Sequence, residues 1–367
     1  MTQNTQTPQK KRRDPEGLIA IALIFTVLFE IFLTVVLLVR SFSGVAPIEP
    51  PSNPSTPPTG DYEPIVYRPL YVDNTADLSD DPSVKSKYVL LMNADTWEVV
   101  AQKNSDLRFS PASMTKVMTL LVACNRLTEA DLEKKLVYSR EVVEYVSSGE
   151  YAGTSFSLPR DNPERPDITY MGDRYTVRSM LYGIGVSSAA DCTYMIIREI
   201  AGTEAAFVDL MNQTAQELGL ENTHFNNAVG FESADNYSTA ADMAVIMNHA
   251  MKNALIADIL KVRTEDYRIK GYYTNGDAED EYEVALKPSI NSRLKHYPSF
   301  ALTSCDLEAT KTGYTTGSYM VCSVTHKTTG VRYVLVFGEA DVPQSTQSGK
   351  FKETMQDIEW VCNTYLP

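Results

Sequence analysis

The sequence predicts an α+β fold: an antiparallel sheet formed by N- and C-terminal strands, with helices on both sides. Residues 87–92 and 97–101 are strand-like runs on either side of a turn-forming stretch, which indicates a hairpin. Three further strand-like runs lie near the other end of the chain, at residues 309–313, 319–325 and 332–337. Because most of the helical segments lie between these two groups, we expect one domain whose sheet joins the two ends.

The intervening helices are predicted from apolar periodicity. They cover residues 176–181, 191–201, 204–218 and 239–252, with a break at 183–185 and Ser238 as the cap of the last of them, and a closing helix covers 349–365. Residues 263–300 are polar and are expected to be irregular. Their acidic run at 277–281 indicates a solvated loop.

Two segments at the start of the chain indicate attachment to a membrane. Residues 1–16 are polar with a basic cluster at 10–13, and residues 17–39 are almost continuously apolar. A helix of this length spans a bilayer with some tilt, and the basic cluster favours a cytoplasmic N-terminus. We expect a cytoplasmic tail (1–16), a single-pass transmembrane anchor in the cell membrane (17–39) and an extracellular domain. The alternative, a cleaved signal peptide, is disfavoured by the length of the apolar region. Glu30 within it is either protonated or faces a partner helix.

Residues 40–85 differ in composition from the segments on either side. Eight prolines lie between positions 47 and 69 among Ser, Thr, Gly and Asp. This composition is typical of an extended, semi-rigid linker without a core of its own. We therefore expect the globular domain to cover residues 86–367 and to be held away from the outer face of the membrane.

Composition excludes several classes of function. The chain carries 47 acidic and 33 basic residues, for a formal charge of −14, so a nucleic-acid partner is not expected. The five cysteines are scattered and form no CxxC pair, and the four histidines are dispersed. Neither a disulfide framework nor a metal site is indicated, and we expect no cofactor.

Ser113 and Lys116 are the first candidate pair for chemistry. Ser110 and Pro111 suit the cap and first turn of a helix, and residues 117–124 are apolar nearly all round, which is typical of a buried helix. The pair shares one helix face. A desolvated lysine favours its neutral amine, which can take the proton of a serine hydroxyl and activate it as a nucleophile.

The spacing of this pair is a weak signal by itself. Ser292 and Lys295 have the same spacing without the proline opening or the apolar helix. A capped helix with its lysine reaching solvent is the structural alternative at the first pair.

Two further motifs follow in order, Ser188-Ala189-Ala190 and Lys311-Thr312-Gly313. SxxK, a Ser-x-Asn element and KTG are together the signature of penicillin-binding proteins and class A β-lactamases. With the flanking segments 225–231 and 237–244, the chain most resembles the D-alanyl-D-alanine carboxypeptidases among the low-molecular-mass penicillin-binding proteins. The resemblance covers about residues 86–367 and implies a β-lactamase/transpeptidase-like fold.

The resemblance implies a serine carboxypeptidase that removes the terminal D-alanine of peptidoglycan stem peptides and is acylated by β-lactam antibiotics. Ser113 would be the nucleophile, Lys116 the base for acylation, and Ser188 the relay that carries the proton to the leaving amine. The substrate-binding residues would be Lys311, Thr312, Gly313 and Tyr314.

Two of these residues would hold the substrate's terminal carboxylate, namely Lys311 and Thr312. The backbone N–H groups of Ser113 and Tyr314 would form the oxyanion hole.

The second motif departs from the family pattern, because Ala190 stands where the family has asparagine. Alanine cannot position the lysine or the substrate amide as that asparagine does. Two alternatives stay open: a β-lactamase-like hydrolase, although no glutamate-containing loop like that of class A enzymes is found between Lys116 and Lys311, and a weakly active or non-catalytic module that binds D-Ala-D-Ala ends or penicillin.

Overall fold

The computed structural model describes residues 67–147, 171–340 and 346–367, all within a compact unit formed by Pro64–Pro367. The predicted tail, the predicted anchor and the first part of the predicted linker lie outside these residues. None of the helices that the structure describes is long and apolar enough to cross a membrane.

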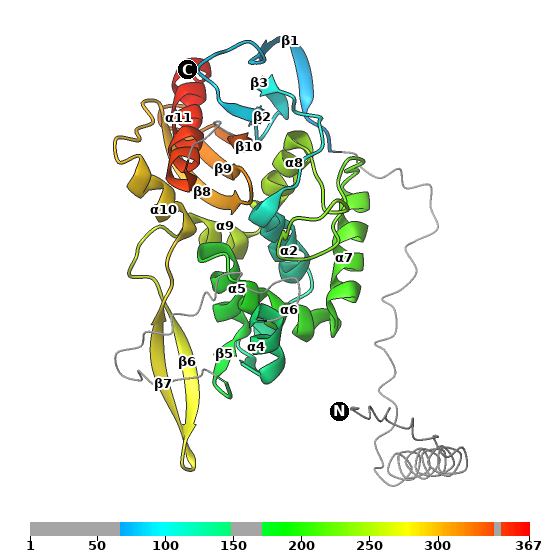
Figure 1. Cartoon of the computed structure of the whole chain (residues 1–367), viewed down its shortest axis with the longest axis vertical. Helices are drawn as coiled ribbons and strands as arrows, with labels where there is room; N and C mark the ends of the chain where they lie inside the picture. The colour runs from blue at the N-terminus through cyan, green and yellow to red at the C-terminus, as the bar shows by residue number, and fades with distance from the viewer. Residues whose placement is uncertain (1–66, 148–170, 341–345) are drawn as a thin grey trace, which may run out of the picture. The chain divides into compact units, whose positions relative to one another are not determined.

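The main sheet has six strands in the order β1-β3-β2-β10-β9-β8 (Figure 1). β2 pairs antiparallel with both β3 and β10, so the two ends of the domain meet at the centre of the sheet, as predicted. The sheet is mixed rather than purely antiparallel, because β1 pairs parallel to β3. The strands are β1 (Leu70–Asp77), β2 (Ser86–Asn93), β3 (Glu98–Lys103), β8 (Cys305–Tyr314), β9 (Ser318–His326) and β10 (Arg332–Ala340).

The expected end of the linker at residue 85 is wrong. β1 already belongs to the sheet, and Leu78 and Val84 behind it are 0% and 3% exposed. β1 is an edge strand whose side chains are mostly exposed. It therefore lacks the alternation of apolar and polar residues by which a half-buried strand is recognised.

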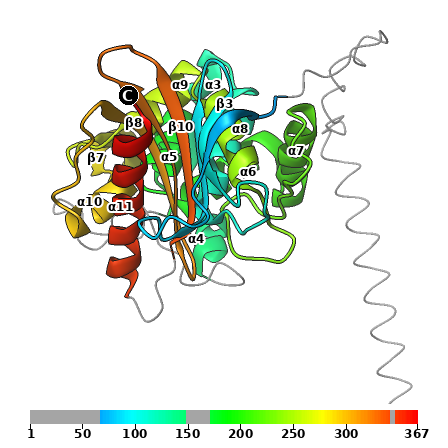
Figure 2. The same ribbon diagram turned by 90° about the horizontal axis from the view of Figure 1, so that it is seen from above.

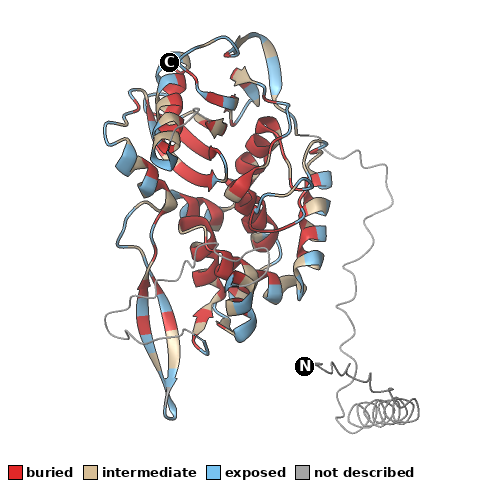
Figure 3. Ribbon diagram, in the orientation of Figure 1, coloured by how far each residue is buried: buried red, intermediate tan, exposed pale blue. Residues whose placement is uncertain are grey.

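The sheet is covered on both faces, which its alternating side chains make possible. Leu90 and Met92 of β2 belong to a core shared with α2 and α8, whereas Val89 and Leu91 belong to a second core shared with α11. Figure 2 shows α11 on one side of the sheet, and Figure 3 shows the buried residues concentrated in the sheet and the central helices. The helices are α2 (Thr115–Cys124), α3 (Glu129–Leu132), α4 (Arg140–Ser147), α5 (Val177–Val186), α6 (Ala190–Ala201), α7 (Glu204–Glu217), α8 (Ala240–Ala250), α9 (Ala254–Lys261), α10 (Ser289–His296) and α11 (Gln347–Tyr365).

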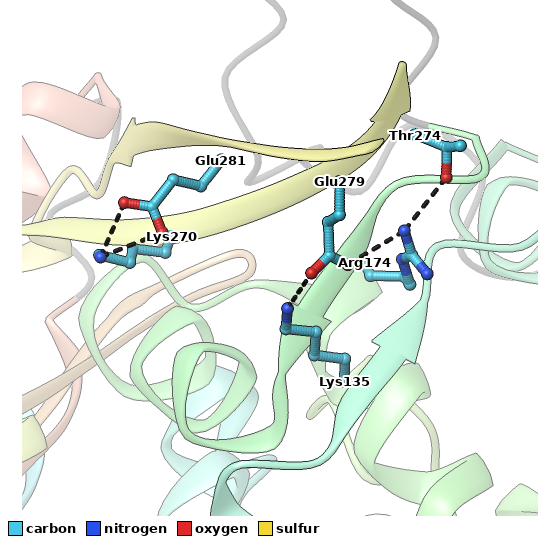
Figure 4. Close-up of polar contacts among 6 residues, drawn as sticks. All are labelled: Lys135, Arg174, Lys270, Thr274, Glu279 and Glu281. Atoms are coloured by element: carbon cyan, nitrogen blue, oxygen red, sulfur yellow. Dashed lines mark hydrogen bonds and ion pairs between the residues drawn. The ribbon is translucent and has the colours of Figure 1, made fainter. Parts of the chain in front are cut away.

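Residues 263–300 are not irregular as expected. They contain α10 and a long hairpin of β6 (Arg268–Asn275) and β7 (Ala278–Ala285), which joins β4 (Lys135–Val137) and β5 (Arg174–Thr176) in a second sheet. All of the acidic run except Asp277 is part of β7, where Glu281 pairs with Lys270 across the hairpin at 2.9 Å (Figure 4). Glu279 pairs with Arg174 of β5 at 3.0 Å and with Lys135 of β4. Cross-strand pairs, both with the neighbouring strand β6 and with the distant strands β4 and β5, thus hold the apparent loop as a strand.

The predicted break at residues 183–185 is also wrong, because α5 runs through both glycines. A Cβ atom on Gly183 would lie 2.4 Å from Cys192 Sγ, and one on Gly185 would lie 2.1 Å from Ile259 Cγ2. These glycines therefore allow α6 and α9 to pack closely against α5. At α8 the capping side chain is that of Thr239, one residue after the predicted Ser238.

Candidate active site

Ser113 lies in a 3-10 turn, η1 (Ala112–Met114), immediately before α2. The predicted cap differs, because the residue before the turn is Pro111. Among the residues that the structure describes, no side chain caps the turn and the buried Ser110 hydroxyl has no hydrogen-bond partner. Lys116 follows in the first turn of α2, so the two residues still face one another. The Lys116 Nζ–Ser113 Oγ distance is 3.1 Å.

The Lys116 side chain is 2% exposed, and its amine also donates to the backbone carbonyl of Val229 at 2.5 Å. Burial lowers the pKa of Lys116 to about 7, and the nearby carboxylate of Asp191 opposes that shift. At neutral pH a large fraction of Lys116 is therefore a neutral amine in contact with the Ser113 hydroxyl. This is the arrangement that general-base activation of a serine requires.

Ser188 lies between α5 and α6 with a positive φ of 61°, a conformation uncommon for a residue with a Cβ. Its hydroxyl oxygen accepts a hydrogen bond from Lys311 Nζ at 2.9 Å. Ser113, Lys116 and Ser188 line one pocket of about 560 Å³, to which Ala190 also contributes. The structure thus brings the three predicted catalytic side chains together.

The predicted substrate-binding residues lie on β8, the edge strand of the sheet, and they divide into two groups. Tyr314 lines the pocket and is 39% exposed. Lys311 and Thr312 are 0% and 3% exposed and are not among the residues that line it. Lys311 Nζ donates to Ser188, and the Thr312 hydroxyl donates to Ser289 Oγ of α10 at 2.8 Å. Burial, reinforced by the charges of Lys116 and Arg293, holds the pKa of Lys311 well below its usual range.

The turn that carries Ser113 is enclosed by two glycines. A Cβ on Gly313 of β8 would lie 3.0 Å from the Cβ of Ala112, and one on Gly230 would lie 1.8 Å from the carbonyl oxygen of Ala112. Gly230 has a positive φ of 79°. Asn227 holds its loop by accepting hydrogen bonds from the N–H groups of Gly230 and Phe231 at 2.7 and 2.9 Å. Close backbone approach from both sides thus fixes the position of Ser113.

Ala190, the departure from the family motif, is 5% exposed and packs with Val146 of α4 and with Val229 in a small apolar cluster. In this structure the lysine is held by a backbone carbonyl, that of Val229, and by Ser113. The contacts of Lys116 therefore do not require an amide side chain at position 190.

Sequence reasoning missed two charged residues of the site. Arg293 of α10 is 3% exposed, donates to the carbonyl of Gly313 at 2.6 Å and lies over the ring of Phe351, with 4.2 Å from its guanidinium carbon to the ring centroid. Asp191 is fully buried and accepts hydrogen bonds from Tyr138 Oη at 3.2 Å and from the Cys192 N–H at 2.9 Å. Arg293 stands between Ser292 and Lys295, in a segment whose sequence gave no sign of a role.

In the part of the chain that the structure describes, His, Cys, Asp and Glu side chains form no group of three that could hold a metal ion. All five cysteines are free thiols.

Comparison with known proteins places these features in a family. The sequence profile of the D-alanyl-D-alanine carboxypeptidases matches residues 75–341. The chain is 29% identical over 260 residues to the D-alanyl-D-alanine carboxypeptidase DacF of Bacillus subtilis, covering 71% of this chain and 59% of that protein. It is 29% identical over 241 residues to DacC of Escherichia coli, covering 65% of this chain and 52% of that protein. The match therefore spans between half and two thirds of these relatives.

Solved structures show the same fold. The crystal structure of a Streptomyces DD-transpeptidase matches with a TM-score of 0.59 and 23% identity, covering 76% of this chain and 97% of that one. Penicillin-binding protein 5 from Haemophilus influenzae matches with a TM-score of 0.57 and 22% identity, covering 76% and 71%. With the family profile matched over most of the folded unit, the chain belongs to the D-alanyl-D-alanine carboxypeptidase family.

Proposed function

We propose that this protein is a serine D-Ala-D-Ala carboxypeptidase that removes the terminal D-alanine of peptidoglycan stem peptides through an acyl-enzyme on Ser113. The observation that carries the proposal is the contact between Ser113 and the buried Lys116, at a position where the lysine pKa is about 7. A neutral amine at 3.1 Å is a competent base for the serine hydroxyl. Family membership supports the same reading.

The proposed reaction assigns one task to each group in the pocket. Lys116 takes the proton of Ser113, whose oxygen attacks the carbonyl of the penultimate D-alanine. The N–H groups of Ser113 and Tyr314 stabilise the oxyanion, and Ser188 passes a proton to the leaving amine of the last D-alanine. Water then attacks the ester, releasing the shortened peptide and restoring the Ser113 hydroxyl.

The terminal carboxylate of the substrate would be bound beside β8. Lys311 and Arg293 are both buried there and close enough for their charges to interact, and burial lowers the pKa of Lys311. A bound carboxylate would favour the charged form of Lys311. In this arrangement Lys311 has a second task, because its amine orients the hydroxyl of Ser188. Thr312 and Gly313 complete the strand that faces the substrate.

A second candidate function is a binding module that uses the same site without turnover. The observation that favours it is the alanine at position 190, where the family motif has asparagine. We favour the enzyme because the carbonyl of Val229 already supplies Lys116 with an acceptor. A lactam-hydrolysing enzyme would share the acylation step and differ only in the rate of deacylation.

The proposal includes the setting of the reaction. Residues 17–39 would anchor the chain in the cell membrane with a cytoplasmic N-terminus, as their apolar length and the preceding basic cluster favour. The catalytic domain would then be extracellular, where peptidoglycan and β-lactam antibiotics are found.

The test is covalent labelling of the full chain by a fluorescent penicillin, with Ser113→Ala as control. We expect labelling of the wild-type protein, none of the variant, and release of D-alanine from diacetyl-L-lysyl-D-alanyl-D-alanine. Labelling without D-alanine release would favour the binding module, and rapid loss of the label with lactam turnover would favour the lactam hydrolase. A folded wild-type protein that takes up no label would overturn the acyl-enzyme mechanism.

A further inference from the structure

α11 borders a cavity of about 620 Å³ that has no task in the reaction proposed above. Its walls come from three segments: α11, the residues that lead into β2, and Tyr297 after α10. The residues of α11 that line the cavity are not those that belong to the second core. The cavity therefore uses the side of the helix that is left over when α11 packs against the sheet.

Trp360 of α11 gives this cavity an exposed aromatic surface, because 43% of the side chain is accessible. Its indole N–H donates to Asp81 at 3.1 Å, and Asp81 also accepts a hydrogen bond from the N–H of Ser83 at 2.8 Å. These bonds tie the ring to the segment before β2. The ring is thus a preformed apolar surface, and a ligand would not have to order it on binding.

The loop after α10 is fixed to the same helix. Glu359 accepts hydrogen bonds from the Tyr297 hydroxyl and, at 2.8 Å, from the N–H of Ala301. Asn363 accepts one from the N–H of Thr303 at 2.9 Å. The walls on both sides of α11 are therefore held in place by direct hydrogen bonds to the helix or to its tryptophan.

The other polar groups of the cavity differ in charge. Glu353 is half-buried and forms no ion pair with any residue that the structure describes. Lys85 adds a positive charge and Gln356 an amide. An anion would meet the carboxylate of Glu353, and a cation would meet the ammonium of Lys85. A neutral ligand whose groups both donate and accept hydrogen bonds suits all three side chains.

We propose that this cavity binds a neutral saccharide, with the C–H face of a sugar ring against Trp360 and its polar substituents bonded to Glu353 and Gln356. Hydroxyl and acetamido groups both donate and accept hydrogen bonds, and the C–H face of a sugar ring is apolar, as the indole requires. The inference rests on the function proposed above for its biological ligand, because stem peptides are carried by a chain of amino sugars.

The position of the cavity along α11 agrees with this ligand. Gln347, the first residue of the helix, lines the Ser113 pocket. At 1.5 Å per residue, Glu353 and Trp360 lie about 9 and about 20 Å further along the helix axis. An extended peptide of five residues spans at most about 17 Å. A stem peptide whose end lies at Ser113 therefore has the length to be attached to a sugar bound beside α11.

Titration with tetra-N-acetylchitotetraose, the tetramer of N-acetylglucosamine, tests the inference in the full chain. The chain has two tryptophans, and Trp97 does not line the cavity, so Trp97→Phe leaves Trp360 as the fluorescent reporter. We expect a saturable change in its emission. Ligand-observed NMR should give binding that is about tenfold or more weaker in Trp360→Ala, the loss expected for a central aromatic contact.

A second variant does not depend on the tryptophan. Glu353→Gln should weaken binding about two- to tenfold, the range for one hydrogen-bonding group. Asp209→Asn is the matched control, since Asp209 is an exposed carboxylate of α7 that does not line the cavity, and it should bind as the wild type does. Absence of saturation in the wild type, or unchanged binding in both Trp360→Ala and Glu353→Gln, would overturn the inference. Displacement of the saccharide by equal concentrations of propylamine or inorganic phosphate would also contradict it, because a charged ligand would then be preferred.

Acylation with penicillin keeps this inference separate from the proposed activity. The cavity and the Ser113 pocket have no lining residue in common, so saccharide binding should be the same before and after labelling and in Ser113→Ala. Binding that is lost on labelling would place the saccharide in the Ser113 pocket and overturn the inference. Saccharide binding without any labelling would refute the proposed activity alone, and labelling without saccharide binding would refute the inference alone.

Discussion

At the scale of single residues, the chemistry of the site depends on the burial of Lys116, which makes its charged form unfavourable. Lys116 is buried among apolar side chains of α2, so its ammonium form is destabilised and its pKa falls to about 7. Asp191 is also buried and favours the charged form, which keeps the pKa from falling further. The base is therefore tuned by two opposing effects, desolvation and one carboxylate.

This balance predicts the pH dependence of acylation. Lys116 is protonated and inactive as a base below its pKa, so the rate of penicillin labelling should rise with pH, with a midpoint near 7, and then level off. Asp191→Asn removes the carboxylate that favours the ammonium, so the midpoint should move to lower pH. The measurement is the labelling rate between pH 5 and pH 9.

Asp173→Asn is the matched control for that shift. Asp173 is likewise buried and accepts a hydrogen bond from a tyrosine, Tyr282, at 2.6 Å, but Asp191 is the carboxylate whose charge acts on Lys116. A midpoint that stays in place in Asp191→Asn, or that moves equally in both variants, would show that Asp191 does not tune Lys116.

At the scale of elements, the nucleophile is positioned by backbone contacts between three segments rather than by a helix cap. The turn η1 lies between the loop of Gly230 and the edge strand β8, and Gly313 of that strand approaches Ala112 closely. A side chain at either Gly230 or Gly313 would displace η1, so both positions that contact this turn require glycine.

Gly230→Ala tests this arrangement, with Gly202→Ala as control. Both glycines have positive φ, 79° and 73°, so both variants carry the strain of a left-handed alanine, about 1 kcal/mol. At Gly230 the new Cβ would also collide with a backbone oxygen, 1.8 Å away, whereas at Gly202 no described atom beyond the adjoining backbone lies within 4 Å of it. We expect both variants to lose stability from strain and Gly230→Ala to lose more from the collision. A tenfold or greater loss of penicillin labelling by the folded protein, on the order of 1.4 kcal/mol in the barrier, is expected for Gly230→Ala alone. Equal labelling rates in the two variants would contradict the positioning role.

The sequence predicted those elements whose signal is local. The helix from residue 190 to 201 and the strands β8, β9 and β10 follow from continuous or periodic apolar runs. The hairpin of β6 and β7 was missed although its two-residue turn, Gly276-Asp277, is a local signal, because the acidic residues of β7 were interpreted as a solvated loop. The ion-pair partners of Glu279, Lys135 and Arg174, lie more than a hundred residues away in the sequence. The two glycines of α5 were interpreted as a helix break because glycine is common both where a helix ends and where two helices pack closely.

The same distinction applies to the site. Ser113, Lys116 and Ser188 were named from motifs, and the structure gathers them in one pocket. Val229 contributes a backbone carbonyl, which any residue could provide, so no sequence pattern could reveal it. Arg293 reaches Gly313 from a helix twenty residues earlier, and its burial becomes visible only when α10 is packed against β8.

At the scale of the whole folded unit, the two ends of the domain are joined by the sheet and by one buried carboxylate. β10 pairs with β2 along seven residue pairs. Asp357 of α11 accepts hydrogen bonds from the N–H groups of Lys85 and Ser86, at 2.9 and 2.6 Å, and from the Ser86 hydroxyl at 2.6 Å. The C-terminal helix is thus tied to the beginning of the central strand.

Asp357→Ala should therefore loosen this connection. It leaves three donors without their acceptor, two of them backbone N–H groups, and we expect a loss of about 1–3 kcal/mol in the free energy of unfolding, measured with urea. Lys352→Ala, an exposed position on the same helix, is the control and should change stability by less than about 0.5 kcal/mol. The loss in Asp357→Ala should depend on pH.

The direction of that dependence follows from the Asp357 pKa, which burial raises from 3.8 to about 6. Between these values the folded state holds a proton that the unfolded chain has released, so the stability contributed by this group is present below about 3.8 and is lost as the pH rises through about 6. The stability difference between wild type and Asp357→Ala should accordingly be larger at pH 4.5 than at pH 7.5. A difference that grows with rising pH would mean that the three hydrogen bonds to the carboxylate outweigh its desolvation, and would reverse the assignment of burial as the dominant effect.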